Sequence, residues 1–163
     1  METDPIAEPG VEARILSVSP FSGDHQSIES CVSPLGWGVL QAQGLSEAFG
    51  LADCACVVVC ERDLMPGSWL ELLHYVQGRP NPPLLIVTSR LADDRLWAEA
   101  LNLGAWDVLA KPLVVNEVVR SIEQALRHRH CQLRFRRFSV CLGFIFHRLA
   151  GIRRSSGSLL DQP

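Results

Sequence analysis

The chain has 163 residues, of which 47% are hydrophobic and 20% are charged, and its formal net charge is −3. This length suits one domain with tails, and the apolar content excludes wholesale disorder. The net charge conceals a division, because residues 1–126 hold 17 of the 18 acidic residues whereas residues 127–163 hold eight arginines and one acid. A basic tail on an acidic body predicts a separate binding partner for the tail.

Residues 1–13 contain two prolines, one glycine and four acids, and we expect them to form a disordered lead-in. They are acidic, whereas a secretory signal begins with basic residues followed by an apolar run. We therefore expect a cytoplasmic protein whose six cysteines are free thiols.

Hydrophobic patterns predict strands that alternate with helices along the rest of the chain. The elements expected in chain order are a strand at 14–18, a helix through 28–35, a strand at 37–42, a helix at 46–52, a strand at 54–60, a helix at 69–76, a strand at 84–87, a helix at 92–103, a strand at 108–110 and a helix at 115–126. This alternation indicates an α/β fold with a doubly wound, five-stranded parallel sheet and helices on both faces.

Local signals predict where several helices begin and end. Ser46 and Ser68 are expected helix N-caps, and Glu71 completes a capping box with Ser68. Gly104 follows a helix at the position where a left-handed residue is favoured. The helix before it is expected to bury one apolar face, made by Leu96, Trp97, Ala100 and Leu101.

The apolar run from Cys54 to Cys60 is typical of a strand buried on both faces, and it ends at Glu61. Ligand sites of open α/β sheets lie outside the carboxyl ends of the strands, so Glu61 is a candidate site residue. The cysteines at 54, 56 and 60 share one face of this strand. Ligands along one flat strand do not converge tetrahedrally, so we expect core packing for these thiols and no metal site.

Several short motifs occur together in one order. They are Ile15-Leu16-Ser17-Val18, Met65-Pro66-Gly67, Leu70-Glu71-Leu72-Leu73, Ile86-Val87-Thr88, Gly104-Ala105 and Lys111-Pro112. With them, residues 14–128 resemble the receiver domain of bacterial two-component response regulators. The resemblance implies a flavodoxin-like sheet with strand order 2-1-3-4-5. It leaves residues 129–163 as a C-terminal helical tail.

The resemblance also implies a site with a hydroxyl residue after the fourth strand and a lysine after the fifth. Thr88 and Lys111 match these positions, and Pro112 matches the proline that follows the lysine.

Two other features of the family's site are altered in this sequence. The family has two acids after the first strand that bind Mg²⁺, and Ser19 and Pro20 stand there instead. The family has a phosphoacceptor aspartate after the third strand, and Glu61 stands in that position. Neither Ser19 nor Pro20 can neutralise a hard cation, so we expect Mg²⁺ binding to be lost and no cofactor to be needed. The pattern is that of a degenerate receiver, or pseudo-receiver.

The function expected from these residues is phosphorelay signalling through protein contact, independent of phosphorylation, with Glu61 as a charge mimic. The partner would be a histidine kinase or a downstream regulator at the face made by the helix at 92–103, the strand at 108–110 and the helix at 115–126. No Ser-His-Asp arrangement, P-loop or dinucleotide-binding turn is recognisable, so we do not expect an enzyme. Three alternatives stay open: Glu61 as an ordinary surface acid, a response regulator phosphorylated on Asp63, and a membrane-peripheral adaptor that uses the fold as a scaffold.

The tail has an apolar seam at alternating spacings of three and four residues, flanked by arginines. The seam is made by Phe135, Phe138, Leu142, Ile145, Leu149 and Ile152. Its apolar centre is far shorter than the ~20 residues that span a bilayer. A basic amphipathic helix of this kind either lies on an anionic membrane surface or packs on its own domain or a second copy. Nucleic acid is not an expected partner, because no DNA-reading motif is recognisable.

Overall fold

The computed structural model describes residues 13–152 of the chain, with the side chains of residues 13–133. The chain divides into two compact units, Met1–Arg129 and His130–Pro163. The sheet and the start of the last helix belong to the first unit. None of the helices in the described part combines the length and the hydrophobicity that a membrane span requires.

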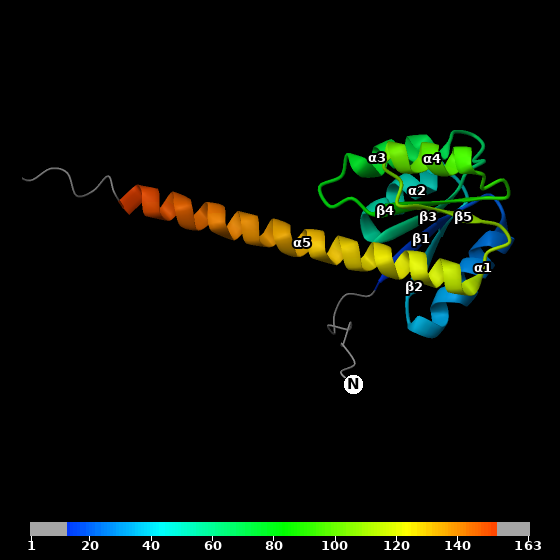
Figure 1. Cartoon of the computed structure of the whole chain (residues 1–163), viewed down its shortest axis with the longest axis horizontal. Helices are drawn as coiled ribbons and strands as arrows, with labels where there is room; N and C mark the ends of the chain where they lie inside the picture. The colour runs from blue at the N-terminus through cyan, green and yellow to red at the C-terminus, as the bar shows by residue number, and fades with distance from the viewer. Residues whose placement is uncertain (1–12, 153–163) are drawn as a thin grey trace, which may run out of the picture. The chain divides into compact units, whose positions relative to one another are not determined.

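Strands and helices alternate along the described chain (Figure 1). In chain order the elements are β1 (Arg14–Val18), α1 (Ser22–Val32), β2 (Gly38–Ala42), α2 (Leu45–Leu51), β3 (Val57–Glu61), α3 (Trp69–Gln77), β4 (Leu84–Ser89), α4 (Asp94–Leu103), β5 (Asp107–Ala110) and α5 (Val115–Ile152), with short 3-10 helices at Ser33–Leu35 and Ala52–Cys54. The strands form one parallel sheet in the order β2-β1-β3-β4-β5. The predicted doubly wound sheet and its strand order are therefore confirmed.

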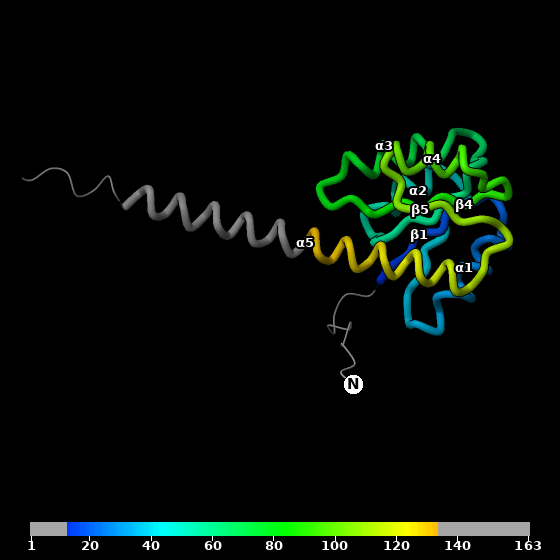
Figure 2. Tube along the Cα trace, viewed as in Figure 1, coloured from blue at the N-terminus to red at the C-terminus, as the bar shows by residue number. Residues whose placement is uncertain are grey.

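The sheet buries its two faces in two separate apolar clusters. Leu16, Val58 and Val87 belong to the cluster under α2, α3 and α4, whereas Ile15 and Val59 belong to the cluster with α1 and α5. Neighbouring residues along a strand point to opposite faces, so this alternation follows directly from the pleat. Strands β1 and β3, distant in sequence, pair in parallel. Figure 2 shows the same trace, with α3 and α4 on one side of the strands and α1 and the start of α5 on the other.

The structure confirms two of the predicted helix boundaries. Ser68 is the N-cap of α3, and its hydroxyl accepts a hydrogen bond from the Glu71 backbone N–H at 3.4 Å. Gly104 ends α4 in the left-handed conformation, with φ of 99°. A residue with a Cβ is strained at that φ, which explains why glycine suits the position.

Two sequence predictions about the first half of the chain are wrong. The N-cap of α2 is Gly44 and the helix begins at Leu45, so Ser46 lies inside the helix and does not cap it. The predicted third strand also begins too early. Residues 52–54 form a 3-10 turn that continues α2, and pairing with β1 and β4 starts only at Val57, which leaves Cys54 exposed.

The expected apolar face of α4 is only half buried. Leu96 and Ala100 are buried, but Trp97 and Leu101 are 45% and 39% exposed. In an α-helix, residues four apart share one side, and each of these two pairs therefore forms its own stripe. The helix packs on the sheet through the first stripe, and the second stripe, Trp97 and Leu101, remains on the surface.

Candidate functional site

Three strand ends bring the predicted site residues to one edge of the sheet. Glu61 is the last residue of β3 and pairs in register with Thr88 of β4, and Lys111 follows β5 directly. Val59, Ile86 and Leu109 point to the sheet face that α1 and α5 cover. Glu61, Thr88 and Lys111 each follow one of these residues by two positions, so their side chains point to the same face. This shared face explains how residues from three strands converge.

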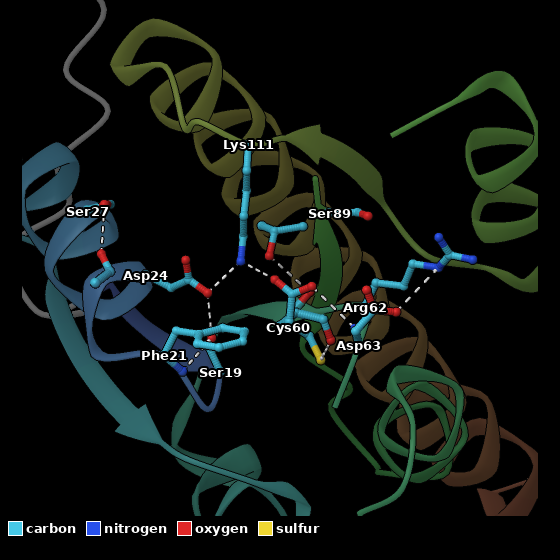
Figure 3. Close-up of polar contacts among 12 residues, drawn as sticks. Ser19, Phe21, Asp24, Ser27, Cys60, Arg62, Asp63, Ser89 and Lys111 are labelled. Carbon is cyan, nitrogen blue, oxygen red and sulfur yellow. Dashed lines mark hydrogen bonds and ion pairs between the residues drawn. The ribbon is translucent and has the colours of Figure 1, made fainter. Parts of the chain in front are cut away.

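The centre of the site is the ammonium group of Lys111, which contacts two carboxylates (Figure 3). Its Nζ donates to Oε2 of Glu61 and, at 2.5 Å, to Oδ2 of Asp24. The exposed fractions of the three side chains are 10% for Lys111, 5% for Glu61 and 18% for Asp24. Glu61 is therefore buried and is not a surface residue, whereas its pair with Lys111 is expected whether or not Glu61 has a signalling role.

Asp24 is a site residue that the sequence analysis did not identify. It lies in the first turn of α1, where a carboxylate is favoured by the helix dipole. The Ser19 hydroxyl donates to the same Oδ2 at 2.5 Å. The signal that could have identified Asp24 is its place in the helix that follows β1, because this helix starts at the same edge of the sheet.

Ser19 and Pro20, at the positions of the family's acid pair, have different surroundings. Ser19 is buried, and its hydroxyl oxygen also accepts a hydrogen bond from the Phe21 backbone N–H at 3.1 Å. Pro20 is exposed. The hydroxyl of Ser19 thus stabilises the β1–α1 turn and orients Asp24.

Thr88 and Pro112 lie beside the charged cluster without joining it through their side chains. The Thr88 hydroxyl is buried and donates to the backbone carbonyl of Cys60 at 3.4 Å. Pro112 is exposed and follows a cis peptide bond after Lys111. The structure therefore brings Glu61 and Lys111 together and keeps the Thr88 hydroxyl on the backbone of β3.

Asp63, the other candidate phosphoacceptor, faces away from this cluster. Its backbone N–H donates to Oε1 of Glu61 at 3.3 Å, but its side chain is 77% exposed and lies 4.0 Å from the Arg62 guanidinium. The second oxygen of Glu61 is thus bonded to the backbone, so both of its oxygens have partners.

Phe21 lies above the ammonium group. Lys111 Nζ lies 5.9 Å from the centroid of the Phe21 ring, and the Arg90 guanidinium lies 5.8 Å from it. The face of an aromatic ring attracts cations at this range. Phe21 is half exposed, so its ring lies at the surface beside the site.

The described cysteines differ in burial, and this predicts a difference in reactivity. Burial, with a smaller effect from the Glu61 carboxylate, raises the pKa of the Cys60 thiol far above its usual value. The reactive form is the thiolate. A thiol reagent should therefore label the exposed Cys54 and Cys131 rapidly in the native protein and leave Cys60 unmodified. Mass spectrometry of peptides before and after unfolding checks this, and native labelling of Cys60 at the rate of Cys54 would contradict it.

The apolar seam of the tail lies outside the described side chains. The backbone of α5 is helical to Ile152. Nothing described bears on how Phe135, Phe138, Leu142, Ile145 and Leu149 pack, so the tail's membrane or self-association role stays a prediction.

Sequence comparison relates this chain to transcriptional regulatory proteins. No protein-family model matches the chain. The transcriptional regulatory protein FixJ of Bradyrhizobium diazoefficiens is 31% identical over 121 residues, which cover 71% of this chain and 58% of FixJ. The C4-dicarboxylate transport transcriptional regulatory protein DctR of Rhodobacter capsulatus is 38% identical over 73 residues, or 42% of this chain and 36% of DctR. The chain thus spans little more than half of the first relative and about a third of the second.

Solved structures give the same result for the domain. The signal receiver domain of an HD domain-containing protein from Pseudomonas fluorescens superposes with a TM-score of 0.69 at 25% identity, covering 80% of this chain and 98% of that one. The receiver domain of a putative Luxo repressor protein from Vibrio parahaemolyticus has a TM-score of 0.70 at 15% identity, over 75% and 95% of the two chains. Because the strand order and the sequence similarity agree, the chain carries a receiver domain of the response-regulator family.

Proposed function

We propose that this receiver domain signals through protein contact without being phosphorylated, and that Glu61 stands permanently in the place of a phosphoacceptor. The observation that supports this proposal is the double ion pair of Lys111, whose ammonium group is bonded to Glu61 and Asp24 at once. The lysine that would meet a phosphoryl group in the family therefore already has two anionic partners.

The chemistry of phosphoryl transfer supports the same conclusion. Transfer depends on positioning and on cations that neutralise the charge of the phosphoryl oxygens. In this site the charge of Lys111 is shared between two carboxylates, and Ser19 and Pro20 supply no acid for a metal ion. An incoming phosphate would meet a cluster with more negative than positive charge.

The proposed output surface is the α4–β5–α5 face, and its partner is a histidine kinase or a downstream regulator. The exposed stripe of Trp97 and Leu101 on α4 supports this assignment, since a large aromatic side chain on the surface is the kind of residue that anchors protein interfaces. For the basic tail we propose contact with an anionic membrane or with a second copy of the chain, on the strength of its arginines and apolar seam. Vesicle sedimentation and analytical ultracentrifugation separate these two partners.

A phosphorylation assay tests the proposed function. The protein incubated with a small-molecule phosphodonor and Mg²⁺ should remain unmodified, because Lys111 is occupied and no acid pair is present to hold the metal. Phosphate-affinity gels and intact-mass spectrometry measure the result, with an ordinary receiver domain carrying an aspartate acceptor as the positive control. Phosphate on Asp63 would support the alternative of a working response regulator, and Asp63→Asn should then abolish it.

A further inference from the structure

The charged cluster at the carboxyl edge of the sheet consists of Lys111, Glu61 and Asp24. The receiver family implies a divalent cation at this edge, bound mainly by acids that follow the first strand. The residues present do not fit that ion. Ser19 uses its hydroxyl on Asp24 and on the Phe21 backbone, and among the described residues no group of three or more His, Cys, Asp or Glu side chains could hold a metal.

From this disagreement we infer that the Lys111 ammonium group is the resident cation of the site, and that, with no acid at positions 19 and 20 to hold a metal ion beside it, it closes the Asp24 and Glu61 carboxylates to divalent metal ions. Its two carboxylate partners come from different elements, α1 and β3, so it joins these elements as a metal ion would. This inference rests on the proposed function, and it gives Lys111 the role of keeping metal ions out of the site.

The surroundings of Nζ suit an organic ammonium better than a hydrated metal ion. Nζ donates to one oxygen of each of two carboxylates, and the centroid of the Phe21 ring lies 5.9 Å from it. Aromatic faces bind ammonium and guanidinium groups, whereas Mg²⁺ and Mn²⁺ prefer oxygen ligands and retain water. The 10% exposure of the Lys111 side chain leaves little room for such water.

The geometry further indicates that the metal site is latent. Asp24 and Glu61 both bond to one nitrogen atom, so their carboxylates approach each other closely enough for a single small cation to contact both. A carboxylate pair without its lysine has strong electrostatic reason to take up another cation. Removing the ammonium group while keeping both acids should therefore create cation binding that the natural chain lacks.

The test compares the melting temperatures of full-length variants with and without millimolar Mn²⁺. A ligand that binds only the folded state raises the melting temperature. The natural protein and Lys111→Arg should show no shift, and Lys111→Met should gain several degrees in Mn²⁺. The matched control is Lys111→Met with Asp24→Asn, which keeps the shape of the site and removes one carboxylate. Its melting temperature should not rise in Mn²⁺.

Each outcome of this experiment decides the inference. A Lys111→Met variant that needs Mn²⁺ to fold, as seen by circular dichroism, supports it as strongly as a shifted melt. If the Lys111→Met variant stays unfolded in Mn²⁺, the same measurements on Lys111→Gln, with and without Mn²⁺, test the inference instead. A lysine-free variant that is folded yet indifferent to Mn²⁺, or a natural protein that Mn²⁺ stabilises, overturns it. Phosphorylation of the natural chain would instead defeat the proposed function, whatever the lysine variants do.

Discussion

Lys111→Met should lower the free energy of unfolding by about 3–5 kcal/mol in metal-free buffer, the range for removing one partner of a buried ion pair. The physical reason is that Glu61, 5% exposed, and Asp24, 18% exposed, would face each other without the ammonium group between them. Their mutual repulsion adds to the cost of leaving them unpaired. Urea unfolding measures the change, provided that the m-value, the slope of the unfolding free energy against urea concentration, is unaltered.

Three further variants separate charge from packing at this position. Lys111→Arg keeps the charge and should lose less stability than Lys111→Met. Asp24→Asn should also lose less, because Lys111 retains Glu61 and because Asp24 is the more exposed of the two acids. Adding Glu61→Gln to Lys111→Met should recover part of the loss, since the remaining cluster then holds one charge. A Lys111→Met protein as stable as the natural one would show that the cluster does not hold the edge of the sheet together.

Much of this site could be predicted from the sequence because it depends on strand periodicity. A buried apolar run that stops at a charged residue indicates the end of a parallel strand, and all such ends lie at one edge. Glu61 follows from that rule, whereas Thr88 and Lys111 were expected from the resemblance to receiver domains. The sheet order that the resemblance implies was correct, and it is one that a doubly wound fold allows.

Asp24 and the direction of the Thr88 hydroxyl could not be predicted in the same way. Asp24 reaches Lys111 from a helix, at a sequence distance of 87 residues, and only the angle of α1 against the sheet places it there. Thr88 can satisfy its hydroxyl either in the site or on a neighbouring carbonyl, and the structure shows the bond to Cys60. Side-chain choices of this kind depend on packing, which hydrophobic patterns do not encode.

The exposed Trp97 and the early start assigned to β3 reflect a similar limit. Helical periodicity indicates which residues of α4 share a side, but the width of the buried stripe depends on how the helix sits on the sheet. The apolar residues before Val57 satisfy a strand pattern equally well, yet residues 52–54 complete a helical turn because no neighbouring strand pairs with them in the structure described here. Tertiary pairing decides such boundaries.

Restoring the family's acids should make the domain accept phosphate. In the variant Ser19→Asp/Pro20→Asp/Glu61→Asp, two carboxylates become available for Mg²⁺ and the acceptor shortens by one methylene. A bound Mg²⁺ would neutralise negative charge at the site, and catalysis of phosphoryl transfer consists mainly of such neutralisation and positioning. Intact-mass spectrometry with a small-molecule phosphodonor should show modification only when Mg²⁺ is present.

The matched control is Ser19→Asn/Pro20→Asn/Glu61→Asp, which has nearly the same shape and lacks the two added charges. It should take no phosphate, and Glu61→Asp alone should behave likewise, because an aspartate acceptor without a metal site still faces Asp24 across the occupied Lys111. After Ser19→Asp, the new carboxylate can still accept the hydrogen bond from the Phe21 backbone N–H that the Ser19 hydroxyl accepts now, so the β1–α1 turn should survive the change.

A folded triple-aspartate variant that binds Mg²⁺ and still takes no phosphate would show that the Lys111–Asp24 pair prevents phosphorylation. Adding Asp24→Asn to that variant should then allow phosphorylation. Equal phosphorylation of the aspartate and asparagine variants would show instead that residue 61 alone determines whether this site accepts phosphate.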